Sequence, residues 1–131
     1  MTGTQKAVLV AGIAFVVFGI AGFVTSGSSM EADPSMAPEL FGTFPVNVLH
    51  NVVHLALGLW GLIAARTWHA ARTYARATGV LYLLLAGLGL IAPDGFGLVP
   101  IGGSDVALHA FLGVSLLAIG LAAKEGRLRT A

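Results

Sequence analysis

Long apolar stretches alternate with short polar segments along the chain. Four of these stretches are long enough for membrane-crossing helices, since about 20 helical residues span a hydrocarbon core of about 30 Å. We place the spans at about residues 7–25, 46–66, 73–92 and 105–124. Strands of a membrane barrel would alternate in polarity over about ten residues, and these stretches do not. The pattern therefore predicts an all-α integral membrane four-helix bundle, with residues 1–131 forming one domain.

Composition and charge strengthen this interpretation, because 56% of the residues are hydrophobic and only 10% are charged. Positive residues concentrate on the cytoplasmic side of membrane proteins. Here they border one end of the predicted spans, at Lys6, Arg66, Arg72, Arg76, Lys124, Arg127 and Arg129. All acidic residues except Glu125 fall on the opposite side, and Asp105 opens the fourth span there. We therefore expect a multi-pass protein of the plasma membrane with both termini in the cytoplasm.

The chain contains no Cys, which excludes disulfides, thiolate metal sites and thiol catalysis. The basic residues adjoin the apolar spans, so their expected contacts are anionic lipid headgroups, and nucleic acid is not an expected partner. The expected partners are the lipid bilayer and, through apolar helix faces, other membrane proteins or a second copy in a homo-oligomer.

One predicted helix carries a polar face at the start of an otherwise apolar run. At 100° per residue, its polar and small residues share an arc of about 100°. They are Asn47, His50, Asn51, His54, Gly58 and Gly61. We expect this face to point into the bundle, with Pro45 opening the helix.

The two halves of the chain resemble each other. Val53-His54-x-x-Leu57-Gly58 matches Leu108-His109-x-x-Leu112-Gly113, 55 residues later. Gly12-Ile13-Ala14-Phe15 aligns with Gly79-Val80-Leu81-Tyr82, 67 residues later. This likeness predicts a two-plus-two helix duplication with the second and fourth spans parallel. The polar residues Asn47, His50, Asn51, His54, Asp105 and His109 then converge near the external surface.

These polar residues admit several interpretations. In the first, they form a hydrogen-bonded cluster that fixes helix packing, because an unpaired polar group in hydrocarbon costs several kcal/mol. Asp105 would cap the fourth helix and bond to His109 one turn later.

In a second interpretation, His54 and His109 hold a b-type haem, and Gly58 and Gly113 leave space for the macrocycle. The lack of basic residues on the external side to pair with the propionates opposes this interpretation. In a third, His50 and His54 chelate a zinc or copper ion that His109 and Asp105 complete.

Enzymatic and transport roles find little support in the sequence. A proton relay would need polar groups below His54 and His109, and the spans offer only Ser115 and glycines there. No nucleophile is paired with a base and a third activating group. We therefore expect a non-enzymatic structural or accessory membrane component, with haem or metal binding as the alternative.

Three motifs of the chain are distinctive in combination: Leu40-Phe41-Gly42-x-Phe44-x-Val46-Asn47-x-x-His50-Asn51-x-Val53-His54, Gly79-Val80-x-Tyr82 and Asp105-x-x-Leu108-His109-x-x-x-Gly113. With these motifs the chain resembles an actinobacterial family catalogued as domain of unknown function 4383. The likeness extends from about Ala7 to Gly120. The resemblance implies a small four-helix membrane protein of unassigned activity, so it assigns no role to any residue.

Overall fold

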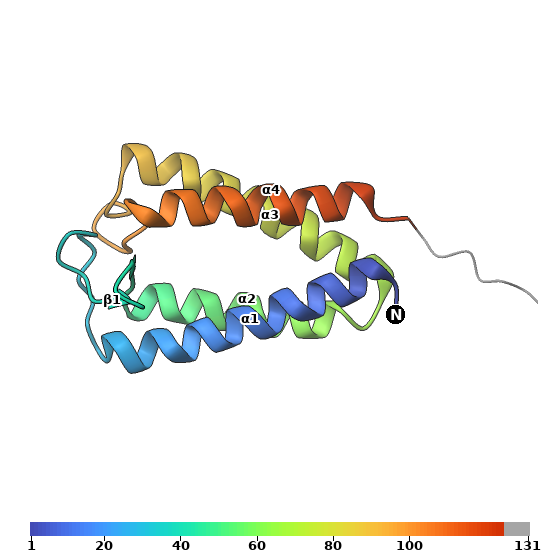
Figure 1. The fold of residues 1–131 in the computed structure, drawn as a ribbon, viewed down its shortest axis with the longest axis horizontal. Helices are drawn as coiled ribbons and strands as arrows, with labels where there is room; N and C mark the ends of the chain where they lie inside the picture. Colours follow the sequence, from blue (N-terminus) through green and yellow to red (C-terminus); the bar gives the residue numbers. More distant parts are fainter. Residues whose placement is uncertain (125–131) are drawn as a thin grey trace, which may run out of the picture.

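A computed structural model describes residues 1–124 of the chain, and within that range the fold is all-α with four helices (Figure 1). The helices are α1 (Gly3–Ser26), α2 (Val48–Ala64), α3 (Trp68–Ile91) and α4 (Ser104–Ala122). Two short antiparallel strands, β1 (Glu39–Leu40) and β2 (Phe44–Pro45), form a small hairpin between α1 and α2. The predicted all-α four-helix architecture is confirmed.

The helices pack as two pairs, α1 with α2 and α3 with α4 (Figure 1). Glycines bring the helices of each pair into backbone contact. A Cβ atom added to Gly12 would lie 2.8 Å from the backbone nitrogen of Leu62, and one added to Gly79 would lie 2.5 Å from that of Leu117. Such small residues drive helix association in membranes, where close van der Waals packing replaces the hydrophobic effect.

Equivalent glycines of the two halves make equivalent contacts, as the sequence duplication predicts. In the first pair, Gly58 packs on Val16. In the second pair, Gly113 packs on Leu83. Gly113 follows Gly58 by 55 residues and Leu83 follows Val16 by 67, which are the two offsets of the sequence alignment. The contact of Gly12 with Leu62 and that of Gly79 with Leu117 are related by the same two offsets. The second pair therefore repeats the first, and α2 and α4 run parallel (Figure 1).

Helix starts differ from the predicted boundaries because side chains cap them. Pro45 does not open α2 but pairs with Glu39 in the hairpin, and Asn47 caps the helix by accepting a hydrogen bond from the backbone of His50. Helix α3 begins before the predicted residue 73, because Thr67 accepts a hydrogen bond from the backbone of Ala70. A polar cap outweighs local hydropathy at these positions, since unpaired backbone amides are costly.

Two connections, residues 27–47 and 92–103, meet at one end of the bundle, which we call the loop end. Ser104 donates a hydrogen bond to the carbonyl oxygen of Thr43, and the Asn47 side chain donates one to that of Leu98 over 3.0 Å. These bonds tie the two helix pairs together at the loop end.

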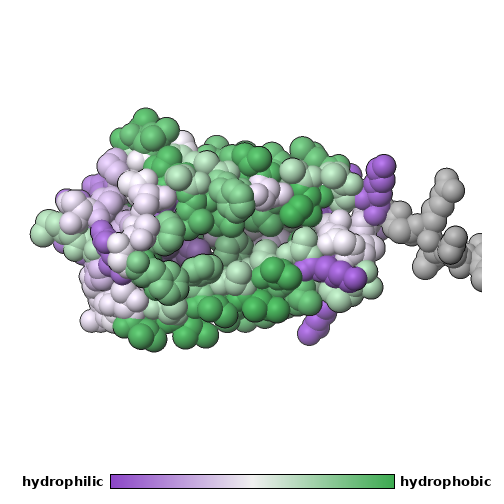
Figure 2. Space-filling view, viewed as in Figure 1, coloured by the Kyte–Doolittle hydropathy of each residue, from purple (hydrophilic) through white to green (hydrophobic). Residues whose placement is uncertain are grey.

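Among residues 1–124, the helices α1, α3 and α4 are long and apolar enough to cross a membrane. Helix α2 is apolar but has 17 residues, a length of about 25 Å at 1.5 Å per residue. Figure 2 shows hydrophobic surface along the helices and hydrophilic surface at both ends. These features indicate a multi-pass membrane protein. Arg127 and Arg129, used above to predict orientation, lie outside the described residues.

Candidate metal centre

Four polar residues on the two parallel helices occupy positions related by the duplication. His50 and His54 lie one turn apart on α2, and Asp105 and His109 lie one turn apart on α4. Asp105 follows His50 by 55 residues, the same interval that separates His109 from His54. The same two positions of each half therefore supply the polar side chains, and the parallel arrangement brings them together between the pairs.

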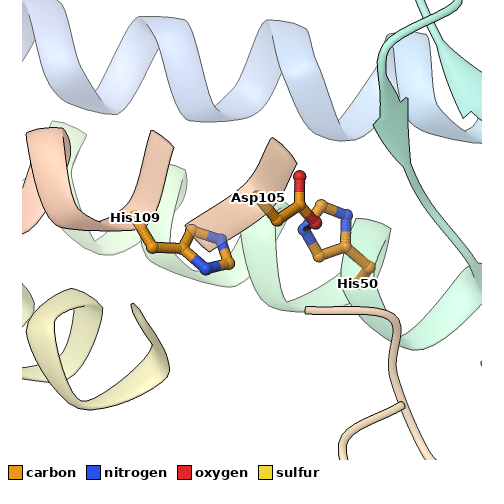
Figure 3. Close-up of side chains that lie close together, drawn as sticks. All are labelled: His50, Asp105 and His109. Atoms are coloured by element: carbon orange, nitrogen blue, oxygen red, sulfur yellow. Dashed lines mark ion pairs between the residues drawn. The ribbon is translucent and has the colours of Figure 1, made fainter. Parts of the chain in front are cut away.

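Three of these residues form a compact group (Figure 3). One potential ligand atom from each of His50, Asp105 and His109 lies within 4.8 Å of the other two. The Nε2 atom of His50 is 3.9 Å from an Asp105 carboxylate oxygen. Asp105 is 1% exposed and His109 is 2% exposed, whereas the His50 side chain is 12% exposed, so the group is buried on the α4 side and slightly open at His50. His54 is the neighbour of His50, with ring centroids 4.5 Å apart, but it lies outside this three-residue group.

The group is notable for its lack of internal hydrogen bonds. Within the described part of the chain, both Asp105 oxygens, both His50 nitrogens and the Nδ1 atom of His109 are buried without a hydrogen-bond partner. The predicted bond between Asp105 and His109 is not formed. Leaving such atoms unpaired in a low-dielectric interior costs several kcal/mol. The arrangement therefore offers several unused donor and acceptor atoms to a ligand.

Asp105 does not cap α4 as predicted. The capping position is Gly103, which provides no side-chain hydrogen bond. Asp105 lies inside the first turn, and its carboxylate faces His50 of α2. A negative charge in the first turn still interacts favourably with the helix dipole, which lowers the cost of burying it.

The asparagines of the predicted polar face do not join the histidines. Asn47 bonds to the backbone of His50 and to Leu98, whereas the Asn51 side chain donates a hydrogen bond to Ser26 on α1 over 2.8 Å. Both amides thus hold structural contacts. The first interpretation of the sequence, one cluster uniting amides and imidazoles, is wrong in this respect.

Gly58 lies at the contact between α1 and α2, and Gly113 lies at the contact between α3 and α4. Neither glycine borders an open space. An added Cβ would lie 2.7 Å from the backbone nitrogen of Val16 at Gly58, and 2.8 Å from that of Leu83 at Gly113. Both glycines serve close helix packing. They do not provide the space for a flat macrocycle that motivated the haem interpretation.

Two aromatic residues missed by sequence reasoning flank the histidines. Phe15 and Tyr82, aligned in the duplication, stack with ring centroids 5.5 Å apart. The ring centroid of Phe15 is 5.6 Å from that of His54, and the ring centroid of Tyr82 is 5.3 Å from that of His109. The alignment of the two halves could have predicted this placement, because it matches Phe15 with Tyr82 and His54 with His109.

Comparison with known proteins gives one finding. The family model described as Domain of unknown function (DUF4383) matches residues 5–122. The chain belongs to this family. No curated protein and no solved structure matches it. The activity of this DUF4383 protein therefore has to be argued from its own residues.

The donor set of the DUF4383 protein suits a borderline transition metal. Imidazole nitrogen and carboxylate oxygen are ligands of Zn²⁺ and Cu²⁺ in proteins. Three points no more than 4.8 Å apart share a centre within about 2.8 Å of each, against metal–ligand distances of about 2.0–2.2 Å. Side-chain rotations that bring each ligand atom inward by less than about 1 Å would thus complete three coordination bonds.

Proposed function

We propose that this protein binds a divalent transition-metal ion, Zn²⁺ or Cu²⁺, through His50, Asp105 and His109. The observation that carries the proposal is the convergence of the buried Asp105 and His109 with His50, one potential ligand atom of each lying within 4.8 Å of the other two. In the described chain, both Asp105 oxygens, both His50 nitrogens and the Nδ1 atom of His109 have no hydrogen-bond partner. A bound cation would compensate the buried carboxylate and use lone pairs that are otherwise unpaired. With three protein ligands, a fourth position stays open for water or for His54.

The ion would have a structural role in a non-enzymatic membrane component. His50 belongs to the first helix pair, whereas Asp105 and His109 belong to the second. One ion would therefore join the two pairs. Binding that occurs only in the folded state adds its free energy to the stability of the fold.

We further propose that both termini are cytoplasmic and that the metal centre lies in the outer half of the membrane. The described Lys and Arg residues adjoin the end of the bundle opposite the loop end, whereas Glu31, Asp33, Glu39 and Asp94 lie in the loop-end connections. Retention of positive residues in the cytoplasm supports this orientation. Cysteine labelling of Ser28→Cys in intact cells, compared with Thr67→Cys, tests it, because only the external thiol should react with an impermeant reagent.

A second candidate function is a metal-free link between the helix pairs. The 3.9 Å approach of His50 to Asp105 favours it, because a protonated imidazole there would form an ion pair with the carboxylate. Breaking a buried ion pair by removing one partner is strongly destabilising. Both candidates predict that the group stabilises the fold, so only metal content distinguishes them.

The deciding experiment is purification from the membrane in mild detergent, followed by elemental analysis and an absorption spectrum of the same sample. We expect about one zinc or copper ion per chain and no Soret band. The variants His109→Ala and Asp105→Asn should lose the ion, whereas His69→Ala, which alters an exposed histidine, should keep it. A wild-type protein without stoichiometric metal that also fails to bind added Co²⁺ or Zn²⁺ would refute metal binding. A Soret band in the wild type that His54→Ala abolishes would instead establish haem.

A further inference from the structure

The two loop-end connections share a sequence motif that is repeated at the same offset as α2 and α4. Pro38-Glu39-x-Phe41-Gly42-x-x-Pro45 is followed 55 residues later by Pro93-Asp94-x-Phe96-Gly97-x-x-Pro100. We call residues 38–46 and 93–101 the first and the second aromatic loop. The duplication therefore includes the segment that leads into each of the two parallel helices.

The two aromatic loops also share their backbone hydrogen bonds. Three amide-to-carbonyl bonds of the first loop recur in the second, with every donor and acceptor shifted by 55 residues. The bonds of the first loop are Gly42 to Glu39, Thr43 to Leu40 and Val46 to Pro38, and those of the second are Gly97 to Asp94, Leu98 to Gly95 and Ile101 to Pro93. One loop structure is thus present twice, with a phenylalanine at the same place in each copy.

That phenylalanine has a strained backbone and an exposed ring in both copies. Phe41 has a φ of 55° and Phe96 has a φ of 59°, a region that glycine adopts without strain and other residues avoid. The two residues are 70% and 75% exposed. The strain lowers the stability of the fold, so a benefit of the ring has to come from a contact outside the described chain.

Phe41 lies below the loop end of α1, at the depth of the hydrocarbon core. Its ring centroid is 6.1 Å from that of Phe18, which precedes the last residue of α1, Ser26, by about 12 Å along the helix. The Phe41 ring therefore lies at least about 6 Å inside the end of α1. With 24 residues, α1 is about 36 Å long and projects only about 3 Å beyond each side of a 30 Å core when it is centred.

The two aromatic loops lie on opposite sides of the bundle. Phe44 of the first loop lines a cavity between α1 and α4. Its equivalent in the second loop, Val99, lines a cavity between α2 and α3. These cavities lie at the two edges of the gap between the helix pairs, because α1 pairs with α2 and α3 pairs with α4. The exposed phenylalanines are therefore presented on two sides of the protein at corresponding levels.

We propose that Phe41 and Phe96 are a pair of anchors that insert into the acyl chains of the leaflet at the loop end. Phe41 packs on Phe18, which is 39% exposed on α1, so its ring continues the lipid-facing surface of that helix. A soluble partner would have to enter the hydrocarbon to reach it. A second copy in a two-fold dimer would cover the same single patch on each subunit, whereas lipid meets both sides alike.

The test measures how strongly lipids with brominated acyl chains quench the fluorescence of a single tryptophan. Phe41→Trp and Phe96→Trp are made with Trp60→Phe and Trp68→Phe, which leaves no other tryptophan, and are reconstituted in phosphatidylcholine vesicles with and without bromine in the upper half of the acyl chain. Met36→Trp is the matched control, because Met36 is 71% exposed in the same connection but outside the aromatic loop. We expect brominated lipid to remove most of the fluorescence at positions 41 and 96 and little at position 36.

The proposal is overturned if either loop tryptophan is quenched no more than the one at position 36. If the background without the native tryptophans does not fold, Phe41→Cys, Phe96→Cys and Met36→Cys labelled with bimane repeat the comparison, since the chain has no other Cys. Disulfide-linked dimers of Phe41→Cys or Phe96→Cys in vesicles, together with weak quenching, would assign the loops to a second copy and also overturn it. Metal content does not enter the measurement, so the result is independent of the proposed function.

Discussion

The close contact of Gly79 with α4 gives a quantitative prediction about helix packing. In Gly79→Ala, the new Cβ would lie 2.5 Å from the backbone nitrogen of Leu117, whereas ordinary contacts begin at 3.4 Å. The two helices must therefore separate by roughly 1 Å, because backbone atoms cannot rotate away as a side chain can. Overpacking of this kind costs about 1–3 kcal/mol, and the gain in helix propensity from Gly to Ala offsets about 1 kcal/mol of it, which leaves a net cost of up to about 2 kcal/mol.

Gly87→Ala is the matched control on the same helix. A Cβ at Gly87 has no atom within 4 Å, so only the favourable propensity term applies. Thermal unfolding in one detergent, followed by circular dichroism, should give a lower midpoint for Gly79→Ala than for the wild type and an equal or higher one for Gly87→Ala. The packing argument is refuted if the two variants have the same midpoint. Gly12→Ala, at the equivalent contact with Leu62, should behave like Gly79→Ala.

Further predictions concern single contacts, each checked by the same unfolding measurement. Asn51→Ala removes the hydrogen bond to Ser26 and should cost about 1–3 kcal/mol, whereas adding Ser26→Ala to that variant should cost little more. Tyr74→Phe removes the bond to the Leu57 carbonyl and should cost about 1 kcal/mol; an unchanged midpoint would contradict the role of this bond. Phe41→Gly should stabilise by about 1 kcal/mol, because Phe41 has a φ of 55° and its ring is exposed, whereas Phe41→Ala should not.

The duplication has a consequence for the candidate metal centre. His54 and His109 occupy equivalent positions in the two halves and are the same residue type. His50 and Asp105 also occupy equivalent positions, but they differ in type. The difference introduces a carboxylate next to imidazoles. Asp105→His would restore equality between the halves and remove the buried negative charge. We expect this variant to bind metal less tightly than the wild type, which a Zn²⁺ competition titration would measure.

The sequence by itself determined the helix class, the approximate positions of the four helices and the two-plus-two repeat. These features depend on local properties, namely the length and hydropathy of each stretch, and the membrane excludes lipid-exposed irregular backbone. The aligned glycines also carried information about packing, because Gly12 and Gly79 make equivalent contacts in the two pairs. The resemblance to the family was likewise visible in the residues and is confirmed over residues 5–122.

Only the tertiary structure decided how the polar face of α2 is divided. An arc of about 100° on one helix touches two neighbours, and the helical period does not distinguish between them. Asn51 and Gly58 face α1, whereas His50 faces Asp105 on α4. Tyr82 enters the site from α3 for the same reason, since its position depends on how one pair lies against the other. Periodicity fixes which face of a helix is polar, but the partner of each residue on that face follows from the packing of whole helices.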